Sequence, residues 1–443
     1  MDKKLLDKFS KRFAEDKQSQ GVKNAIASVG FEKASFNNNV LRKHNFVFSD
    51  ETKRGDITNQ KSSGRCWMFA SLNVARVSVM EKLNMKTFEF SQNYTFFWDK
   101  LEKANYFLEN ILHTLDEDID SRLMKHLLEA PLQDGGQWDM FKEILKKYGA
   151  VPKSVMPETF HSSNSRMLDT IMTMRLREDA CRIRQQYKEG KKKKALRAEK
   201  DDMLYEIYNI LTKALGEVPT KFDFSYRDED ENFHRIEGIT PQEFFKKYVG
   251  WNMDDKISLI NAPTADKPYG KAYTVQYLGT IYEADPVRYV NVPMEDLKKA
   301  AIRSIQDGHP VWFGCDVGQR LGRKEGIMDL ETYDFEDTLG FTPGMTKAER
   351  LDYSESVLTH AMVLVGVDLD KKGNPLKWKV ENSWGDENGD KGIYSMSDAW
   401  MNEFTYQVMV DRKYVDKKWL KAYDGEVTEL KPWDPIGSLA KNN

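Results

Sequence analysis

Apolar residues recur at helical spacing through the first half of this chain. Residues 67–79 (WMFASLNVARVSV) are almost wholly apolar and predict a helix that is buried on most sides. Residues 93–114 carry aromatic residues and leucines at helical spacing, and residues 140–148 predict a further helix that stops at Gly149. Charged residues dominate residues 165–216, which predict a long helical insertion whose exposed apolar positions are available for subunit contacts.

The pattern changes towards β-structure beyond Pro241. Residues 273–281 and 311–317 predict strands, and residues 294–307 between them predict an amphipathic helix. The last strands are predicted within residues 360–410. A helical half followed by a β half predicts a fold of the α+β class.

Residues 60–70 (QKSSGRCWMFA) place a cysteine where a turn becomes a helix. Gly64 permits a tight backbone approach, and Ser62 and Ser63 are residues typical of a helix N-cap. A thiolate here is stabilised by the free N–H groups and the dipole of the helix, so Cys66 is predicted to ionise at neutral pH. This makes Cys66 a candidate nucleophile. On position alone, a buried structural cysteine is the commoner interpretation.

A cysteine nucleophile needs a histidine base and a group that orients the base, and both occur far downstream. His360 begins an apolar, β-prone run, and Asn382 ends the next predicted strand. Adjacent strands bring imidazole and carboxamide together, so that Asn382 accepts from one ring nitrogen and the other faces Cys66. Trp384 is placed to shield that hydrogen bond from water. Each residue alone suits a structural role, but together they favour catalysis.

Composition and charge limit the classes of protein to which this chain can belong. The 443 residues allow two or three domains, and 40% hydrophobic residues suffice for sizeable cores. A net charge of −3 argues against a dedicated nucleic-acid binder. Residues 191–194 (KKKK) are the exception; we interpret them as a solvated helix face rather than a basic docking patch, so nucleic acid is a disfavoured partner.

The three cysteines, Cys66, Cys181 and Cys315, are too few for a disulfide framework and lack metal-ligand spacing. No metal and no cofactor are therefore expected. Residues 1–10 lack the apolar core of a signal peptide, and no stretch reaches the ~20 apolar residues that cross a bilayer. We expect a soluble cytoplasmic protein with no membrane partner.

The joint order of these segments and three further ones resembles the papain-like cysteine peptidases, and within them the bleomycin hydrolase and aminopeptidase C family. The further segments are residues 134–140 (DGGQWDM), 148–153 (YGAVPK) and 433–440 (WDPIGSLA). The resemblance spans most of the chain. It implies a two-lobed papain-like fold, with a helical lobe, a β-barrel-like lobe, a large helical insertion and a C-terminal arm in the cleft.

The resemblance also implies how the chain is divided and assembled. The expected parts are an N-terminal arm of one polar helix and a loop (1–45), a helical lobe with the nucleophile helix (46–164), a helical insertion for oligomer contacts (165–245), a β-rich lobe with His360 and Asn382 (246–430) and a C-terminal arm (431–443). The family further implies a ring-like homohexamer with its active sites inside a chamber, which restrains a peptidase in the cytosol.

Site roles are carried over from the resemblance residue by residue. The expected residues are the nucleophile Cys66, the base His360, its orienter Asn382, the oxyanion-hole donor Gln60, and the substrate-binding residues Gly135, Gly136, Trp384 and Ala440. The two glycines let the substrate main chain approach closely, because they lack side chains. Without the family context, an ordinary Asp-Gly-Gly turn explains them equally well.

Three departures from the secreted papain pattern are informative. Ser63 replaces a cysteine, so the disulfide of that pattern is absent, and Arg65 stands where a small residue is expected. His360 lies 294 residues beyond Cys66, so about 150 residues are inserted. Such an insertion is expected of the bleomycin hydrolase branch.

The C-terminal tail determines the expected selectivity. In this family the C-terminal arm occupies part of the cleft, and its carboxylate binds the free α-amine of the substrate. Here residues 441–443 (KNN) follow Ala440 and displace the carboxylate by up to ~10 Å of chain unless they are trimmed. We predict a broad-specificity cysteine aminopeptidase that takes peptide substrates. An oligopeptide endopeptidase of the same family and an acyl transferase to amines are the alternatives.

Overall fold

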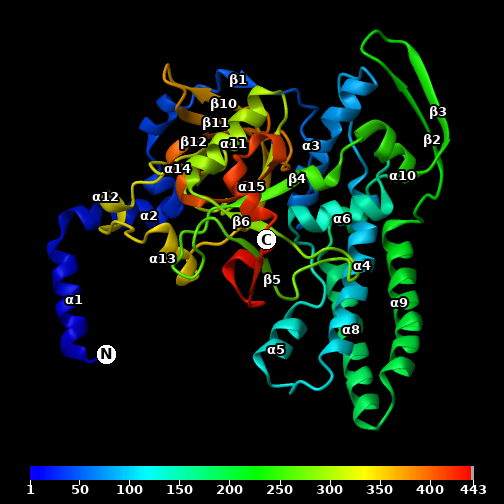
Figure 1. The fold of residues 1–443 in the computed structure, drawn as a ribbon. Helices are drawn as coiled ribbons and strands as arrows, with labels where there is room; N and C mark the ends of the chain where they lie inside the picture. Colours follow the sequence, from blue (N-terminus) through cyan, green and yellow to red (C-terminus); the bar gives the residue numbers. More distant parts are fainter. Residues whose placement is uncertain (441–443) are drawn as a thin grey trace.

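The structure is a computed structural model and describes residues 1–440 (Figure 1). One region is helical and runs from the blue to the green part of the chain. It consists of α3 (Cys66–Lys82), α4 (Gln92–His113), α5 (Arg122–Glu129), α6 (Trp138–Tyr148), α7 (Phe160–Ser163), α8 (Arg166–Lys188) and α9 (Lys193–Leu215). Two N-terminal helices, α1 (Lys3–Glu15) and α2 (Lys17–Ser35), precede it, and α1 projects away from the rest of the molecule (Figure 1).

The other region is built on one mixed sheet. Its strands in spatial order are β14 (Val427–Leu430), β5 (Ala272–Val275), β6 (Tyr289–Asn291), β4 (Lys256–Ile260), β13 (Thr405–Asp411), β7 (Val311–Cys315), β10 (His360–Leu369), β11 (Pro375–Glu381), β12 (Ile393–Ser397), β9 (Ile327–Met328) and β8 (Leu321–Gly322). The short strand β1 (Asp50–Glu51) also pairs with β10. A separate ribbon is formed by β2 (Phe222–Arg227) and β3 (Phe233–Ile239).

Short helices join and flank these strands. They are α10 (Pro241–Phe244), α11 (Met294–Gln306), α12 (Phe335–Leu339), α13 (Lys347–Asp352), α14 (Asp398–Phe404) and α15 (Lys417–Tyr423). No helix within residues 1–440 combines the length and the apolar character that crossing a bilayer requires.

The centre of the sheet lies between two helices, α3 and α11. Successive side chains of a strand point to opposite faces, and β10 shows this alternation. Ala361 and Val363 belong to the apolar cluster that contains α3, whereas Met362 and Leu364 belong to the cluster that contains α11. The helix that begins at Cys66 is thereby held against the strand that begins at His360.

Sequence periodicity predicted most of these elements. The helices expected at residues 93–114 and 140–148 are found as α4 and α6, and α6 ends at Gly149, which has φ +70°. The strand expected at residues 273–281 is wrong in length. β5 ends at Val275 because the chain turns at Tyr277, whose φ is +57°.

Two segments of the chain each form a pair of helices. The N-terminal segment contains α1 and α2 instead of one helix and a loop, because Asp16 ends the first helix and caps the second. The charged segment 165–216 forms α8 and α9. In the turn between them, Lys191 pairs with Glu199 and Lys193 lies 3.6 Å from Asp116, which fits a solvated basic face.

Candidate active site

Cys66 is the first residue of α3. The N-cap residue is Arg65, whose side chain makes no capping hydrogen bond. The prediction that Ser62 or Ser63 caps this helix is wrong, because Ser63 Oγ donates to the carbonyl of Gln60 (2.6 Å) instead. The helix N-terminus beside the thiol is therefore free of a competing side-chain acceptor.

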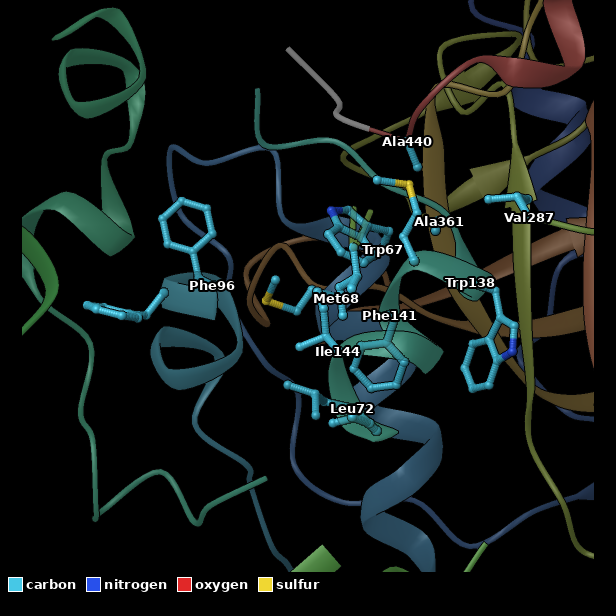
Figure 2. Packing of buried hydrophobic residues seen from close by; sticks show 14 of the residues in the cluster. Trp67, Met68, Leu72, Phe96, Trp138, Phe141, Ile144, Val287, Ala361 and Ala440 are labelled. Carbon is cyan, nitrogen blue, oxygen red and sulfur yellow. The ribbon is translucent and has the colours of Figure 1, made fainter. Parts of the chain in front are cut away.

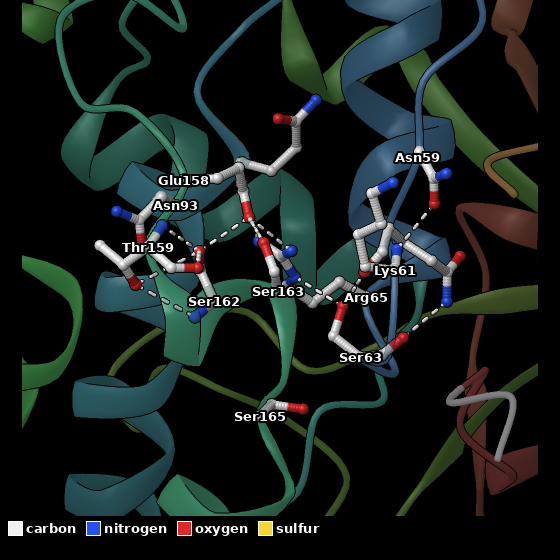
Figure 3. A network of polar contacts seen from close by, with 12 residues as sticks. Asn59, Lys61, Ser63, Arg65, Asn93, Glu158, Thr159, Ser162, Ser163 and Ser165 are labelled. Atoms are coloured by element: carbon white, nitrogen blue, oxygen red, sulfur yellow. Dashed lines mark hydrogen bonds and ion pairs between the residues drawn. The ribbon is translucent and has the colours of Figure 1, made fainter. Parts of the chain in front are cut away.

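Arg65, unexpected at this position from the papain pattern, anchors the turn that carries the nucleophile. Its guanidinium donates to both carboxylate oxygens of Glu158 (3.0 and 2.7 Å) and to Ser63 Oγ (2.9 Å), within the polar network of Figure 3. It also lies 5.0 Å from the ring centre of Phe69 and 5.1 Å from that of Phe96. The bidentate pair fixes this buried side chain in one orientation.

His360 and Asn382 are brought together as the sequence predicts. His360 Nε2 lies 2.9 Å from Asn382 Oδ1, which also accepts from the backbone N–H of Ser383 (2.8 Å). Two donors at this atom identify it as the amide oxygen, so Nε2 carries the proton and Nδ1 is left as a base. Nδ1 is buried and has no hydrogen-bond partner within residues 1–440. The Trp384 ring covers the imidazole, with 4.8 Å between ring centres.

The protonation of Cys66 differs from the sequence expectation. Burial raises the pKa of the thiol to about 12, although backbone N–H groups of Ala361 and Trp67 lower it. Burial also lowers the pKa of His360 to about 4, and the bond to Asn382 offsets only part of this. The helix N-terminus stabilises the thiolate, but burial outweighs it. In the closed site, burial favours a neutral thiol and a neutral imidazole.

Gln60 is buried next to the nucleophile turn. Its Oε1 accepts from Ser383 Oγ (2.7 Å), and its Nε2 donates to the carbonyl of Ser63 (2.6 Å). An amide nitrogen carries two hydrogens, so one N–H remains for a further acceptor. The backbone N–H of Gln60 also donates to the carbonyl of Ser383 (2.8 Å), which ties this loop to the segment after Asn382.

Gly135 and Gly136 form what we call the glycine edge. The chain's own C-terminal segment occupies this edge. Gly136 and Ala440 exchange backbone hydrogen bonds of 3.3 and 3.2 Å in an antiparallel bridge. Figure 2 shows Ala440 on the same side of the core as Ala361 and Trp67. A Cβ on Gly136 would lie 2.4 Å from the Trp67 ring, so only glycine permits this approach. Residues 441–443, which were predicted to displace the terminal carboxylate, lie outside the described part of the chain.

The sequence profile of the peptidase C1-like family matches residues 1–437. The chain belongs to the peptidase C1-like family. The family expected from the sequence motifs is confirmed, and the predicted enzyme class, a cysteine peptidase, is that of the family.

The sequences of relatives match this peptidase over most of its length. An aminopeptidase C from Listeria monocytogenes is 50% identical over 435 residues, 98% of this chain and 98% of the relative. The bleomycin hydrolase of Homo sapiens is 44% identical over 392 residues, 87% of this chain and 86% of the relative. The crystal structure of pepw from Lactobacillus rhamnosis superposes with a TM-score of 0.97, at 48% identity and with 99% of each chain covered. The predicted α+β class is confirmed.

A buried charge cluster beneath the site of this peptidase was not predicted. Asp99, Lys100, Lys103 and Asp134 are buried, and the half-buried Asp169 pairs with Lys100. Asp134 Oδ2 accepts from the backbone N–H of Gly64 (2.6 Å), and Lys103 Nζ donates to the carbonyl of Gly135 (2.6 Å). The cluster thus joins the nucleophile turn to the glycine edge. Its sequence signal is the charge at positions 99, 100 and 103 within an otherwise aromatic helix.

A second buried ion pair joins the two halves of the site. Arg76 on α3 lies 2.7 Å from Glu381, and both side chains are 2% exposed. Glu381 directly precedes Asn382, so this pair links the nucleophile helix to the strand that carries the orienting amide. No local sequence pattern connects residues 305 positions apart.

Proposed function

We propose that this peptidase is a cysteine aminopeptidase that releases N-terminal residues from peptides through a thioester on Cys66. The antiparallel bridge between Gly136 and Ala440 carries the proposal, because Gly136 packs against the ring of Trp67, the residue that follows Cys66 in the chain. It places the end of the described chain where a longer substrate would otherwise extend. Curated relatives of similar length bear the name aminopeptidase C.

The chemistry follows from the protonation states that burial favours. His360 Nδ1 takes the proton of the Cys66 thiol as the sulfur attacks the peptide carbonyl, so thiolate and imidazolium form together. The amide of Gln60 and the backbone N–H of Cys66 donate to the oxyanion. His360 then returns the proton to the leaving amine, which leaves the acyl group on sulfur. The same ring takes a proton from water, the resulting hydroxide hydrolyses the thioester, and the thiol is restored.

Asn382 and Trp384 serve the base throughout this cycle. The 2.9 Å bond from Nε2 to Asn382 keeps the ring in one orientation in both the neutral and the charged state, so that Nδ1 can take up and release the proton. Trp384 covers the ring, which lowers competition from water for that bond. We assign Gly135 and Gly136 to main-chain binding, and Ala440 to the arm that shortens the cleft.

We propose the finer fold expected from the sequence as well, two papain-like lobes with the arm lying between them. In support, Cys66 begins a helix of the helical region, whereas His360 and Asn382 belong to the sheet. Ala440 bridges to the helical side, and Ser438 Oγ donates to the carbonyl of Leu358 on the sheet side (2.8 Å). The arm thus touches both regions.

A free N-terminus is expected to be required for rapid cleavage. A carboxylate at the arm's end would make a charge-assisted hydrogen bond to the substrate ammonium, and acetylation removes that charge. We expect a free peptide to be hydrolysed about 10- to 100-fold faster than its N-acetylated twin. The measurement compares both peptides with the full-length protein and with a form ending at Ala440.

The four combinations separate the candidate activities. Preference for the free peptide in either form supports the aminopeptidase, and hydrolysis of the acetylated peptide by the full-length form alone implicates residues 441–443. Equal rates on both peptides with both forms would exclude the aminopeptidase and favour an endopeptidase.

We also propose self-association, with a homohexamer as the expected assembly. The helix α1 has no buried residue, and Leu5, Leu6, Phe9 and Phe13 lie 38–51% exposed on it. An unpartnered apolar face of this size on a projecting helix is suited to contact another subunit (Figure 1).

Charging this face is expected to reduce the oligomer's mass. The double substitution Phe9→Glu and Phe13→Glu should shift the particle to smaller species in light scattering, because carboxylates cannot be buried unpaired in an apolar contact. Lys11→Glu, on the same helix but 80% exposed in its side chain, is the control and should leave the mass unchanged. An unchanged mass in the double variant would exclude α1 from the interface.

A further inference from the structure

The C-terminal arm, residues 431–440, is held by a series of specific contacts. The ring of Trp433 lies 4.0 Å from the Arg122 guanidinium, and Asp434 pairs with Lys267 (3.0 Å). Beyond these, one side chain holds the arm at two points: Gln137 Nε2 donates to the carbonyls of Ile436 (3.1 Å) and Ser438 (2.6 Å). No motif predicted this contact, which spans about 300 residues of chain.

The amide of Gln137 can have only one orientation. Its oxygen accepts from the hydroxyl of Tyr289, and both Gln137 and Tyr289 are fully buried. If the amide were flipped, its oxygen would face two carbonyl oxygens, and its nitrogen would face the hydroxyl. The two carbonyls can only accept, so they hold the N–H groups toward the arm, and the Tyr289 hydroxyl supports this orientation by donating to the amide oxygen.

Gln137 also directly follows Gly136 in the chain. The residue that bridges to Ala440 and the residue that holds Ile436 and Ser438 thus share one peptide unit. A peptide with residues on the N-terminal side of the scissile bond needs the same glycine edge. To bind, it must displace Ala440, and the Gln137 bonds oppose that displacement.

We propose that Gln137, oriented by Tyr289, is a specificity-determining clamp that keeps N-blocked and longer peptides out of the cleft by holding the arm in place. The proposal rests on the aminopeptidase function proposed above. A pocket of about 550 Å³ borders the arm at Ser438 and Leu439.

Loss of the clamp is expected to relax the selectivity. Gln137→Met keeps the side-chain length and removes both donors, so hydrolysis of an N-acetylated peptide relative to the free peptide should rise about 10- to 30-fold. Tyr289→Phe removes the hydroxyl that donates to the amide oxygen of Gln137, while both carbonyl acceptors of the N–H groups stay in place. It should raise the same ratio by a smaller factor, about 3-fold.

Asn93 provides a matched control. It is fully buried, and its Nδ2 donates to two backbone carbonyls, those of Pro157 and Leu215, at 2.8 Å each. Asn93 is labelled in Figure 3, and neither of its two hydrogen bonds involves the arm. Asn93→Leu removes an equivalent pair of buried hydrogen bonds, so it should lower stability while the ratio of the two rates stays unchanged.

Hydrogen exchange of the arm provides a readout independent of activity. In Gln137→Met the backbone N–H of Ala440 should exchange about 10-fold faster than in the wild type, and in Asn93→Leu at the wild-type rate. Faster exchange in Gln137→Met without any preference of the wild type for free peptides would show that Gln137 holds the arm, but it would exclude both the aminopeptidase function and the role of Gln137 in selectivity. Unchanged exchange and an unchanged ratio in both Gln137→Met and Tyr289→Phe would overturn the clamp.

Discussion

Replacing Cys66 by alanine is expected to reduce peptide hydrolysis by at least about 10⁴-fold, because no thioester forms without the sulfur. The side chain is fully buried at the start of α3, so alanine introduces no clash and leaves the turn anchored by Arg65. The decisive measurement is kcat on a free peptide, together with the mass increase after reaction with a thiol-alkylating peptide analogue. The variant should show no turnover and no labelling at position 66, whereas the exposed Cys181 remains available to the reagent.

Cys315 is the matched control for this substitution. It is also fully buried, lies on β7, and pairs in register with His360. Burial raises the pKa of its thiol as well, so a buried cysteine near the histidine is not unique to position 66. We expect Cys315→Ala to keep activity within a few-fold of the wild type. Undiminished hydrolysis in Cys66→Ala would exclude Cys66 as the nucleophile.

Local sequence patterns predicted the elements that are stabilised by residues close in the sequence. The helix α4 was predicted to within one residue at each end, because an aromatic stripe at helical spacing follows the N-cap Ser91. The strand β5 was predicted too long, because Tyr277 adopts a left-handed backbone conformation that tyrosine does not intrinsically prefer. Tertiary context sets that backbone conformation, so a period-2 pattern does not reveal it.

The sequence predicted which chemical groups form the candidate site, but not how deeply these groups are buried. The motifs around Cys66, His360 and Asn382 name groups that must meet, and the structure places His360 and Asn382 in hydrogen-bond contact. Burial, which dominates the pKa values of Cys66 and His360, depends on the packing of distant segments. The same holds for the Arg76–Glu381 pair, whose partners have no local signal in the sequence.

Replacing Gln60 by methionine is expected to lower kcat by about 10²- to 10³-fold, with little change in KM. The free N–H of its amide would serve an oxyanion that exists only in the transition state, so its loss leaves substrate binding intact. Methionine fills the same buried space next to Ser63 and Ser383 without a donor. The measurement is steady-state kinetics on a free peptide, with the single-turnover rate of acylation to locate the loss.

Ser383→Ala separates donation by the amide from its mere positioning. This change removes the hydroxyl that Gln60 Oε1 accepts from, but it leaves Nε2 in place and held by the Ser63 carbonyl. We expect a loss below about 10-fold, since one orienting hydrogen bond contributes about 1 kcal/mol. A loss in Ser383→Ala as large as in Gln60→Met would mean that the loop's packing matters and the donor does not. A change in Gln60→Met confined to KM would assign Gln60 to substrate binding, because a transition-state donor must change kcat and kcat/KM together.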